Sequence, residues 1–196
     1  MTLNPTDSDE VLALRAQRGE KGAFDQLVLR HKGLLYRFAR RYVGNDDDAY
    51  DVVQNSFVSA WRSLGRYDPK KAFAPWLRAI ALNKCRDFGR RQTVRRRFLR
   101  LFAFQADTQR PPDRNPELQE EEDRNEAARL LALDHAIATL PPFYKEPLLL
   151  VTVSGLTQQE TAVQLNTTTK AIEMRMRRAR KKIAEALTKT GVQAKV

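Results

Sequence analysis

Apolar residues in the first half of the chain recur at the three- and four-residue spacing of α-helices. One apolar stripe runs through residues 24–42 and a second through 49–64, and Asn45 and Asp46 stand between them as residues suited to cap a helix. Residues 65–73 contain turn-forming residues and predict a loop. Pro75 then suits the first position of a third helix, because the backbone N–H that proline lacks would stay unpaired there.

The second half of the chain also predicts helices. Residues 126–139 keep a helical pattern, and Pro141 and Pro142 end it. A short apolar helix follows through Val153 and ends near Gly155. No stretch convincingly alternates apolar and polar residues in the way that a half-buried strand does. The sequence therefore predicts an all-α fold.

Two more helices joined by a tight turn are predicted after this short apolar helix. Thr157 and Glu160 match the S/T-x-x-E capping box, in which the two residues satisfy each other's backbone N–H groups at the start of a helix. Asn166 follows, and asparagine tolerates left-handed turn geometry better than most residues. Thr168 or Thr169 can cap the helix that comes next. This arrangement fits a helix-turn-helix.

A helix-turn-helix places the first turns of its second helix in the major groove of DNA, where side chains meet base edges. The residues at these positions, and the basic residues after them, are candidate DNA contacts. They are Thr169, Lys170, Glu173, Met174, Arg175, Arg177 and Arg178, with Arg180 beyond them. Base-edge contacts would set sequence preference, while phosphate contacts would supply salt-sensitive affinity. We favour DNA binding over the alternative, an ordinary helical hairpin whose basic face is solvated.

Charge divides the chain into blocks. The formal net charge is +11, which favours a polyanionic partner but says nothing about the fold. Basic residues dominate 62–100, whereas 107–126 is rich in acidic residues and broken by prolines. Such a stretch buries little apolar surface and is typical of a linker. We therefore expect one compact piece at 8–100, a flexible linker at 101–125 and a second compact piece at 126–190.

Little in the sequence supports catalysis, a cofactor or a metal site. Cys85 is the only cysteine, and His31 and His135 stand far apart, so no cluster with ligand spacing is present. The polar, acidic start of the chain does not resemble a signal peptide, and no apolar run is long enough to span a bilayer. We expect a cytoplasmic protein that is not an enzyme and has no cofactor, metal or membrane insertion.

Two segments of the first compact piece carry distinctive side chains. The aspartates within 46–51 stand at the start of a helix, where they either complement the helix dipole or form a docking face for a basic partner. Further along, Tyr67, Phe73 and Trp76 are interleaved with lysines and arginines, a combination suited to single-stranded DNA. For Phe73 and Trp76 a place in the core is favoured, because they continue an apolar stripe.

Both compact pieces resemble a known family. The first contains DDDAYDVVQNSFVSAWRSL (46–64) followed by FAPWLRAIALNKCRD (73–87), which resembles region 2 of extracytoplasmic-function sigma factors of the sigma-70 family. The second contains LPPFYKEPLLLVTVSGLTQQETAVQLNTTTKAIEMRMRRARKKI (140–183), which resembles their region 4. Two matching modules in the expected order are more specific than either alone. The resemblance implies a region 2 helical bundle and a region 4 helix-turn-helix, in a sigma factor that directs core RNA polymerase to promoters.

The resemblance also implies roles for individual residues. The helix at 46–64 would dock on the coiled coil of the polymerase β′ subunit, with Asp48, Asp51, Val52, Gln54 and Phe57 as contact candidates. The −10 promoter element would be held as a melted strand by Tyr67, Lys70, Lys71, Asn83, Lys84 and Arg86. Region 4 would read the −35 element as duplex through the helix-turn-helix residues and lie at the β flap of polymerase. Family members are usually held inactive by an anti-sigma factor, so such a partner is expected.

Two other classes of function compete with this interpretation. A stand-alone helix-turn-helix regulator would bind operator DNA by itself, but it would give the first piece no reason to carry the region 2 pattern. A nucleic-acid-processing enzyme would need clustered ligands or a phosphate-binding loop, which the sequence lacks. Ala79, where arginine is common in the family, and Asn166, where glycine is usual, leave the exact promoter sequence open.

Overall fold

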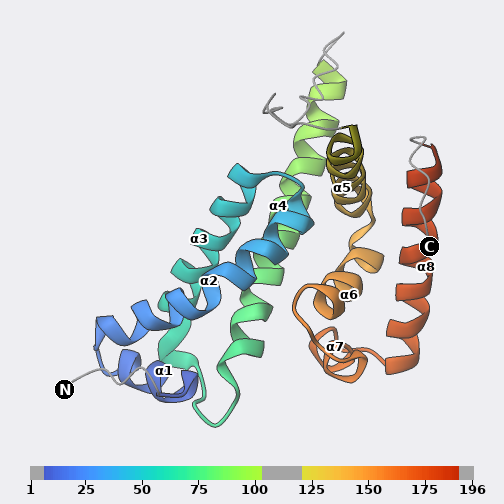
Figure 1. Ribbon diagram of the computed structural model, residues 1–196. Helices are drawn as coiled ribbons and strands as arrows, with labels where there is room; N and C mark the ends of the chain where they lie inside the picture. The colour runs from blue at the N-terminus through green and yellow to red at the C-terminus, as the bar shows by residue number, and fades with distance from the viewer. Residues whose placement is uncertain (1–6, 103–120, 190–196) are drawn as a thin grey trace.

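The computed structural model describes residues 7–102 and 121–189, and every regular element in these two ranges is a helix. In chain order they are α1 (Asp9–Gln17), α2 (Lys21–Val43), α3 (Asp46–Ser63), the 3-10 turn η1 (Leu64–Arg66), α4 (Phe73–Phe102), α5 (Glu121–Thr139), α6 (Pro142–Thr152), α7 (Gln158–Gln164) and α8 (Thr169–Lys189). The predicted all-α fold is confirmed. Most of the expected linker lies outside the described residues. Figure 1 shows two groups of helices side by side, which we call the first module (α1–α4) and the second module (α5–α8).

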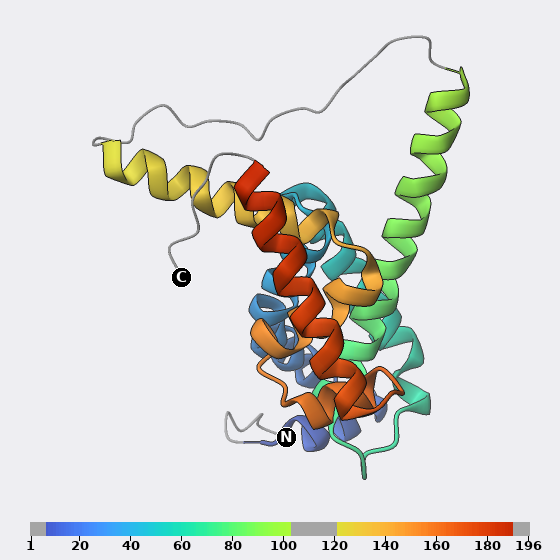
Figure 2. The ribbon, with the colours of Figure 1, turned by 90° about the vertical axis from the view of Figure 1, so that its right-hand side faces the viewer.

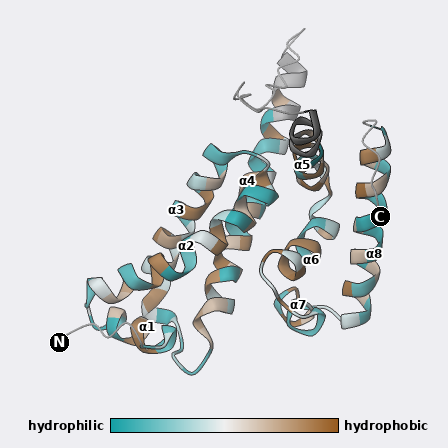
Figure 3. Cartoon of the chain, in the orientation of Figure 1, coloured by the Kyte–Doolittle hydropathy of each residue, from teal (hydrophilic) through white to brown (hydrophobic). Residues whose placement is uncertain are grey.

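The first module folds around apolar residues that all four of its helices contribute. Leu12, Leu27, Ala60 and Leu77 come from the four helices in turn and are fully buried. Burying a leucine side chain contributes about 1.5–3 kcal/mol, so these contacts hold the helices together. In Figure 3, hydrophobic residues (brown) alternate with hydrophilic ones (teal) along the helices. Asn45 caps α3 as predicted, since its side-chain oxygen accepts a hydrogen bond from the third backbone N–H of the helix at 2.9 Å.

Three helix starts differ from the expectation. The sequence pattern does not predict α1, because this short helix has no long apolar stripe; Ser8 caps it, and its side-chain oxygen accepts a hydrogen bond from Val11 N–H at 3.4 Å. Helix α4 begins at Phe73, so Pro75 is its third residue rather than its first. Proline is still tolerated there, because the first-turn N–H groups have no partner within the helix. Helix α5 begins at Glu121, earlier than the predicted residue 126.

The second module contains the predicted helix-turn-helix, built from α7 and α8. Thr157 Oγ1 accepts a hydrogen bond from Glu160 N–H at 3.2 Å, and the Glu160 carboxylate accepts one from Thr157 N–H at 2.8 Å, so the capping box is present. Asn166 occupies the turn with a left-handed φ of 49°. Of the two threonines considered as caps, Thr168 caps α8, because its hydroxyl accepts a hydrogen bond from a first-turn N–H at 3.2 Å.

The two modules share a hydrophobic core. Its buried residues come from α2, α3 and α4 on one side and from α5, α6 and α8 on the other. Tyr42 and Leu82 of the first module belong to it, as do Ile137 and Leu149 of the second. In Figure 2, α8 lies in the foreground over the other helices, while the end of α4 and the start of α5 point away from each other. The modules are therefore packed directly against each other.

Candidate nucleic-acid and protein interfaces

The predicted DNA contacts of the second module gather on the outer side of α8. Ile172, Met176 and Ala179 form the buried side of this helix. The residues exposed on it include Thr169, Lys170, Glu173, Met174, Arg177 and Arg178. Helix α7 packs against α8 in the two-helix arrangement that presents a recognition helix to the major groove. The structure thus brings these candidates together on one exposed surface.

Arg175 is the exception among the candidates, because its guanidinium folds back onto α6. The guanidinium carbon lies 4.0 Å from the centre of the Phe143 ring, and Nη2 donates a hydrogen bond to Thr167 Oγ1 at 3.4 Å. A cation over an aromatic face is attracted by the electrons of the ring. Phe143 therefore holds the Arg175 side chain of α8 in one orientation, against the start of α6. Phe143 was not among the predicted residues, because its only local signal in the sequence is an aromatic residue after a double proline.

Tyr67, expected to meet DNA, lies in the core of the first module. Its ring is buried and packs edge-on against Phe73, with ring centres 5.6 Å apart, and its hydroxyl donates a hydrogen bond to the Lys71 carbonyl oxygen. Burial raises the pKa of this hydroxyl to about 12. Tyr67 thus supports the 65–73 loop from beneath, whereas Lys70 and Lys71 are exposed on it. A direct DNA contact by Tyr67 stays a prediction.

The candidates on α4 fall into two environments. Asn83 is exposed and Lys84 is half-buried, so both have side-chain atoms at the surface. Arg86 instead forms a bidentate ion pair with Glu146 of α6, with Nε 2.8 Å from Oε1 and Nη2 2.6 Å from Oε2. In this conformation, Glu146 of the second module is therefore paired with Arg86, one of the residues predicted to hold the −10 strand.

The predicted protein-docking residues of α3 lie on two sides of the helix. Val52 and Phe57 are buried, so they support the helix from within. Asp51 and Gln54 are exposed. Asp48 is half-buried in the first turn, where its backbone N–H donates to the helix cap. The docking roles of all five residues stay predictions, and only the exposed ones offer side chains to a partner in this conformation.

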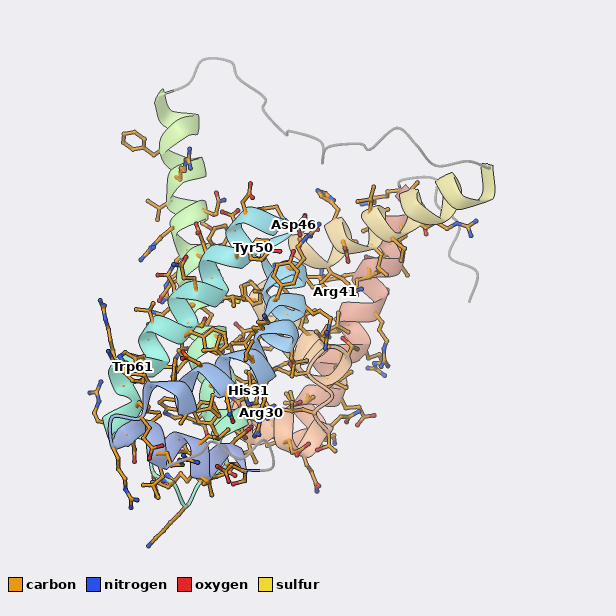
Figure 4. All side chains as sticks on the ribbon, turned by 60° about the vertical axis from the view of Figure 1, so that its left-hand side comes forward. Arg30, His31, Arg41, Asp46, Tyr50 and Trp61 are labelled. Atoms are coloured by element: carbon orange, nitrogen blue, oxygen red, sulfur yellow. The ribbon has the colours of Figure 1, made fainter. Side chains whose placement is uncertain are left out.

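Exposed apolar side chains that the sequence analysis did not assign to docking lie on the same helix. Tyr50, Val58 and Trp61 are 62%, 41% and 41% exposed, and Figure 4 shows Tyr50 and Trp61 toward opposite ends of α3. Together with Asp51 and Gln54 they make up what we call the outer face of α3. Aromatic residues within a polar rim are enriched in protein–protein interfaces, so this face suits a protein partner.

A groove separates the starts of the two candidate DNA-contacting helices. It has a volume of about 730 Å³ and is lined by Pro75 and Arg78 of α4 and by Glu160, Val163 and Thr168 of the helix-turn-helix, among others.

Across residues 7–102 and 121–189, no three His, Cys, Asp or Glu side chains gather as they would around a metal ion. No helix in these ranges is long and apolar enough to cross a membrane.

These features define a helical protein of two modules, one of which carries a helix-turn-helix with an exposed basic recognition helix. Two family models match the chain, Sigma-70 region 2 over residues 27–95 and Sigma-70 region 4 over residues 130–183. The chain belongs to the sigma-70 family of RNA polymerase sigma factors, within its extracytoplasmic-function group. It is a promoter-directing sigma factor.

Relatives match the chain over nearly its whole length. The RNA polymerase sigma factor CnrH of Cupriavidus metallidurans is 35% identical over 193 residues, which cover 94% of this chain and 97% of CnrH. NccH of Alcaligenes xylosoxydans xylosoxydans is 36% identical over 188 residues, with the same coverage of both chains. The solved structure of CnrH in complex with the cytosolic domain of CnrY matches with a TM-score of 0.65 and 33% identity, over 93% of this chain and 99% of CnrH. The sigma factor RpoE from Bartonella quintana, solved with the anti-sigma factor NepR, shares the fold with a TM-score of 0.60, at 23% identity over 84% of this chain and 96% of RpoE.

Proposed function

We propose that the two modules divide the work of promoter recognition. The first, residues 8–100, docks on core RNA polymerase through the outer face of α3 and holds the −10 element as a melted strand along α4 and the 65–73 loop. The second, residues 126–190, reads the −35 element as duplex through α8. Residues 101–125 join them as a linker. The observation that carries this proposal is the row of exposed basic residues on α8, on a chain whose other module has a separate exposed face of aromatic, apolar and polar residues on α3.

The proposed mechanism is binding without catalysis, and it takes place in the cytoplasm, where polymerase meets the chromosome. Polymerase would hold both modules at a set spacing, so that weak contacts to two DNA elements add on one scaffold. Capturing exposed bases would offset the few kcal/mol that unstacking costs. Each wrong base pair in either element should then cost about 1–3 kcal/mol. The mechanism needs no cofactor or metal.

We also propose that an anti-sigma factor regulates the chain. The support comes from the family, because the solved structure of the relative CnrH contains a second protein, the cytosolic domain of CnrY. A pull-down from the source cells with the tagged sigma factor, followed by transcription assays with each captured protein, would identify such a partner by its inhibition of initiation.

Changing the outer face of α3 is expected to weaken binding to core polymerase at least tenfold. The variant combines Asp51→Arg with Gln54→Ala, and a reversed charge at an interface opposes the complementary charge of the partner. Asp25→Arg is the control, because it makes the same change of charge at an exposed aspartate of a different helix, α2. Polymerase affinity and start sites on genomic fragments are measured for both variants and the wild type. Equal affinities would contradict the docking assignment, and a wild-type protein that initiates on no template would contradict the proposed function.

Replacing Phe143 by alanine is expected to weaken promoter binding by the polymerase complex about two- to fivefold, because an exposed cation–π contact contributes about 0.5–1 kcal/mol. The ring is 53% exposed, so the thermal midpoint should fall by no more than about 4 °C, because a loss of about 1 kcal/mol moves it by about 2–4 °C in a protein of this size. Phe143→Tyr keeps the aromatic face and is expected to bind as the wild type does. The affinities are measured on one promoter with and without a mutated −35 element. An alanine variant that binds as tightly as the wild type would show that Phe143 does not position Arg175.

A further inference from the structure

The last residue of α1 holds the start of the 65–73 loop. Gln17 donates two hydrogen bonds from the Nε2 atom of its amide, to the carbonyl oxygens of Leu64 and Tyr67, both at 2.8 Å. A glutamine amide has two N–H donors on that nitrogen, so both are used on the loop. Figure 1 shows α1 beside the loop that joins α3 to α4. One side chain thus fixes two backbone groups that lie 47 and 50 residues further along the chain.

A second residue of α1 holds the end of the same loop. The Glu10 carboxylate accepts a hydrogen bond from the backbone N–H of Phe73, the first residue of α4, at 3.1 Å. The first N–H groups of a helix have no partner within the helix, and an anionic acceptor there also suits the helix dipole. This hydrogen bond holds the pKa of Glu10 below its usual 4.5. We call Glu10 and Gln17, which fix the two ends of the loop, the α1 brace.

Helix α1 is itself anchored in the first module, so it can support the loop. Leu12 and Ala13 are fully buried and Ala16 is 4% exposed, and all three belong to the core that the four helices of this module share. At the other end of the helix, the Asp9 carboxylate pairs with the Arg30 guanidinium of α2 at 2.9 Å. The brace residues therefore extend from a helix whose position the core already sets.

Between its two ends the loop is shaped by its own residues. The Asp68 carboxylate accepts a hydrogen bond from Lys70 N–H at 3.0 Å, and the Asp68 carbonyl oxygen accepts one from Lys71 N–H, also at 3.0 Å. The Tyr67 hydroxyl donates to the Lys71 carbonyl oxygen. These bonds set the shape of the loop tip, whereas its position on the module depends on the buried Tyr67 ring and on the α1 brace.

A loop that is held in place before its partner arrives binds more selectively than a loop that is free to adapt. A free loop loses conformational entropy when it becomes ordered on a ligand, and an ordered loop has already lost it on folding. Flexible, loop-rich surfaces can also rearrange around several ligands, which makes them promiscuous. Fixing both ends of the 65–73 loop should therefore matter most for the rejection of wrong bases.

We propose that Glu10 and Gln17 are positioning residues for −10 recognition, which fix both ends of the 65–73 loop so that Lys70 and Lys71 meet the melted strand in one arrangement. This inference rests on the proposed function, because it takes the loop as a contact to the −10 element. Neither brace residue needs to touch DNA. The proposal gives α1, which lies outside the residues 27–95 that the region 2 family model matches, a part in promoter selectivity.

The α1 brace can be removed with little change in side-chain size. The double variant Glu10→Met with Gln17→Met lacks the carboxylate acceptor and both amide donors. Glu10→Gln is the matched control, because it removes the same charge as Glu10→Met but keeps a carbonyl oxygen that can accept from Phe73 N–H. Asp25→Met, at an exposed residue of α2, controls for the introduction of a methionine.

Trypsin cleavage after Lys70 and Lys71 in the full-length protein measures how firmly the loop is held. Exposed loops are preferred sites of proteolysis, and cleavage follows the population of open conformations. The double variant is expected to be cut after these lysines at least fivefold faster than the wild type, and both controls within about twofold of the wild-type rate. Cleavage after Lys181 of α8, followed by mass spectrometry in the same digest, is expected to stay unchanged, because only global unfolding would speed up both.

The second readout is the base selectivity of the complex between core polymerase and the full-length protein. The probes are fluorescent single-stranded oligonucleotides with the non-template −10 sequence of a start site mapped with the wild type, and with one base changed at the position where the wild type discriminates most. The ratio of the two affinities is expected to fall at least fivefold in the double variant and to stay within about twofold in the controls. Contacts to phosphates are the same for both probes, so they cancel in this ratio. Polymerase affinity is expected to stay within about twofold of the wild type.

The results separate the α1 brace from the proposed function. Equal cleavage of the double variant and the wild type would overturn the brace, and so would faster cleavage without loss of selectivity, because the contacts would then only support the fold. An equal rise in cleavage after Lys181, or an equal loss of selectivity in Glu10→Gln, would assign the effect to unfolding or to charge and would also overturn the brace. Failure of the wild type to initiate with core polymerase would instead overturn the proposed function, whatever the cleavage rates show.

Discussion

Replacing Phe73 by alanine is expected to destabilise the chain by about 3–5 kcal/mol, as large-to-small substitutions of buried aromatic residues do. Phe73 is fully buried and is the first residue of α4. Its ring centre lies 5.6 Å from those of His31 and Tyr67 and 5.5 Å from that of Trp76. Its backbone N–H donates to the Glu10 carboxylate at 3.1 Å. The ring of Phe73 thus joins α2, the 65–73 loop and α4, and its backbone N–H adds a contact to α1.

The same substitution is expected to affect function through the loop. Without the Phe73 ring beneath it, Tyr67 loses its edge-on partner, and the exposed Lys70 and Lys71 lose the support that positions them. Urea denaturation followed by circular dichroism measures the free energy of unfolding. Phe73→Leu, which keeps much of the volume, is expected to cost about 1.5 kcal/mol or less. A Phe73→Ala variant as stable as the leucine variant would show that the ring does not hold the module together.

Local chemistry could be predicted from the sequence where its signal lies within one helix turn. The Asn45 cap, the capping box at Thr157 and Glu160, and the left-handed turn at Asn166 each need only a residue type and its neighbours. The all-α fold and the helix-turn-helix follow from the same kind of short-range pattern. Exposure on α8 was predictable too, because one side of that helix carries regularly spaced apolar residues such as Ile172.

Contacts between distant parts of the chain could not be predicted in this way. Arg86 carries a charge next to other basic residues, and nothing near it in the sequence shows that Glu146 pairs with it across the modules. Lys145 and Glu146 have the composition of surface residues and are buried only because the modules pack on them. Tyr67 is a similar case: its aromatic ring among lysines fits base stacking, but the folding of the loop over α4 places it in the core. Tertiary packing decides each of these cases.

The shared core also carries buried titratable groups, which predict an unusual dependence of stability on pH. Burial raises the pKa of the Cys85 thiol to about 12 from 9.0, and burial, with Glu146 nearby, raises the pKa of Tyr42 well above its usual 10.0. Burial lowers the pKa of Lys145 from 10.5 to about 8. The native state therefore keeps protons on Cys85 and Tyr42 that the unfolded chain releases, and gives up the Lys145 proton that the unfolded chain keeps.

The free energy of unfolding is accordingly expected to rise slightly from pH 8 to 9 and to fall above pH 10. Between about pH 8 and 10.5, Lys145 is protonated in the unfolded state but not in the native state, so its contribution to the free energy of unfolding rises with pH. Cys85 and Tyr42 act in the opposite direction, because the native state holds their protons and the unfolded state releases them. Their contributions fall above pH 9 for Cys85 and above pH 10 for Tyr42. Each such group contributes roughly 1 kcal/mol per pH unit, so Cys85 and Tyr42 together dominate above pH 10.5. Urea denaturation between pH 7 and 11 at constant ionic strength measures this profile. Tyr42→Phe should flatten the fall at alkaline pH, and Lys145→Met should remove the rise between pH 8 and 9. A wild-type profile that falls steadily from pH 8 would contradict a lowered pKa of Lys145 in the native state.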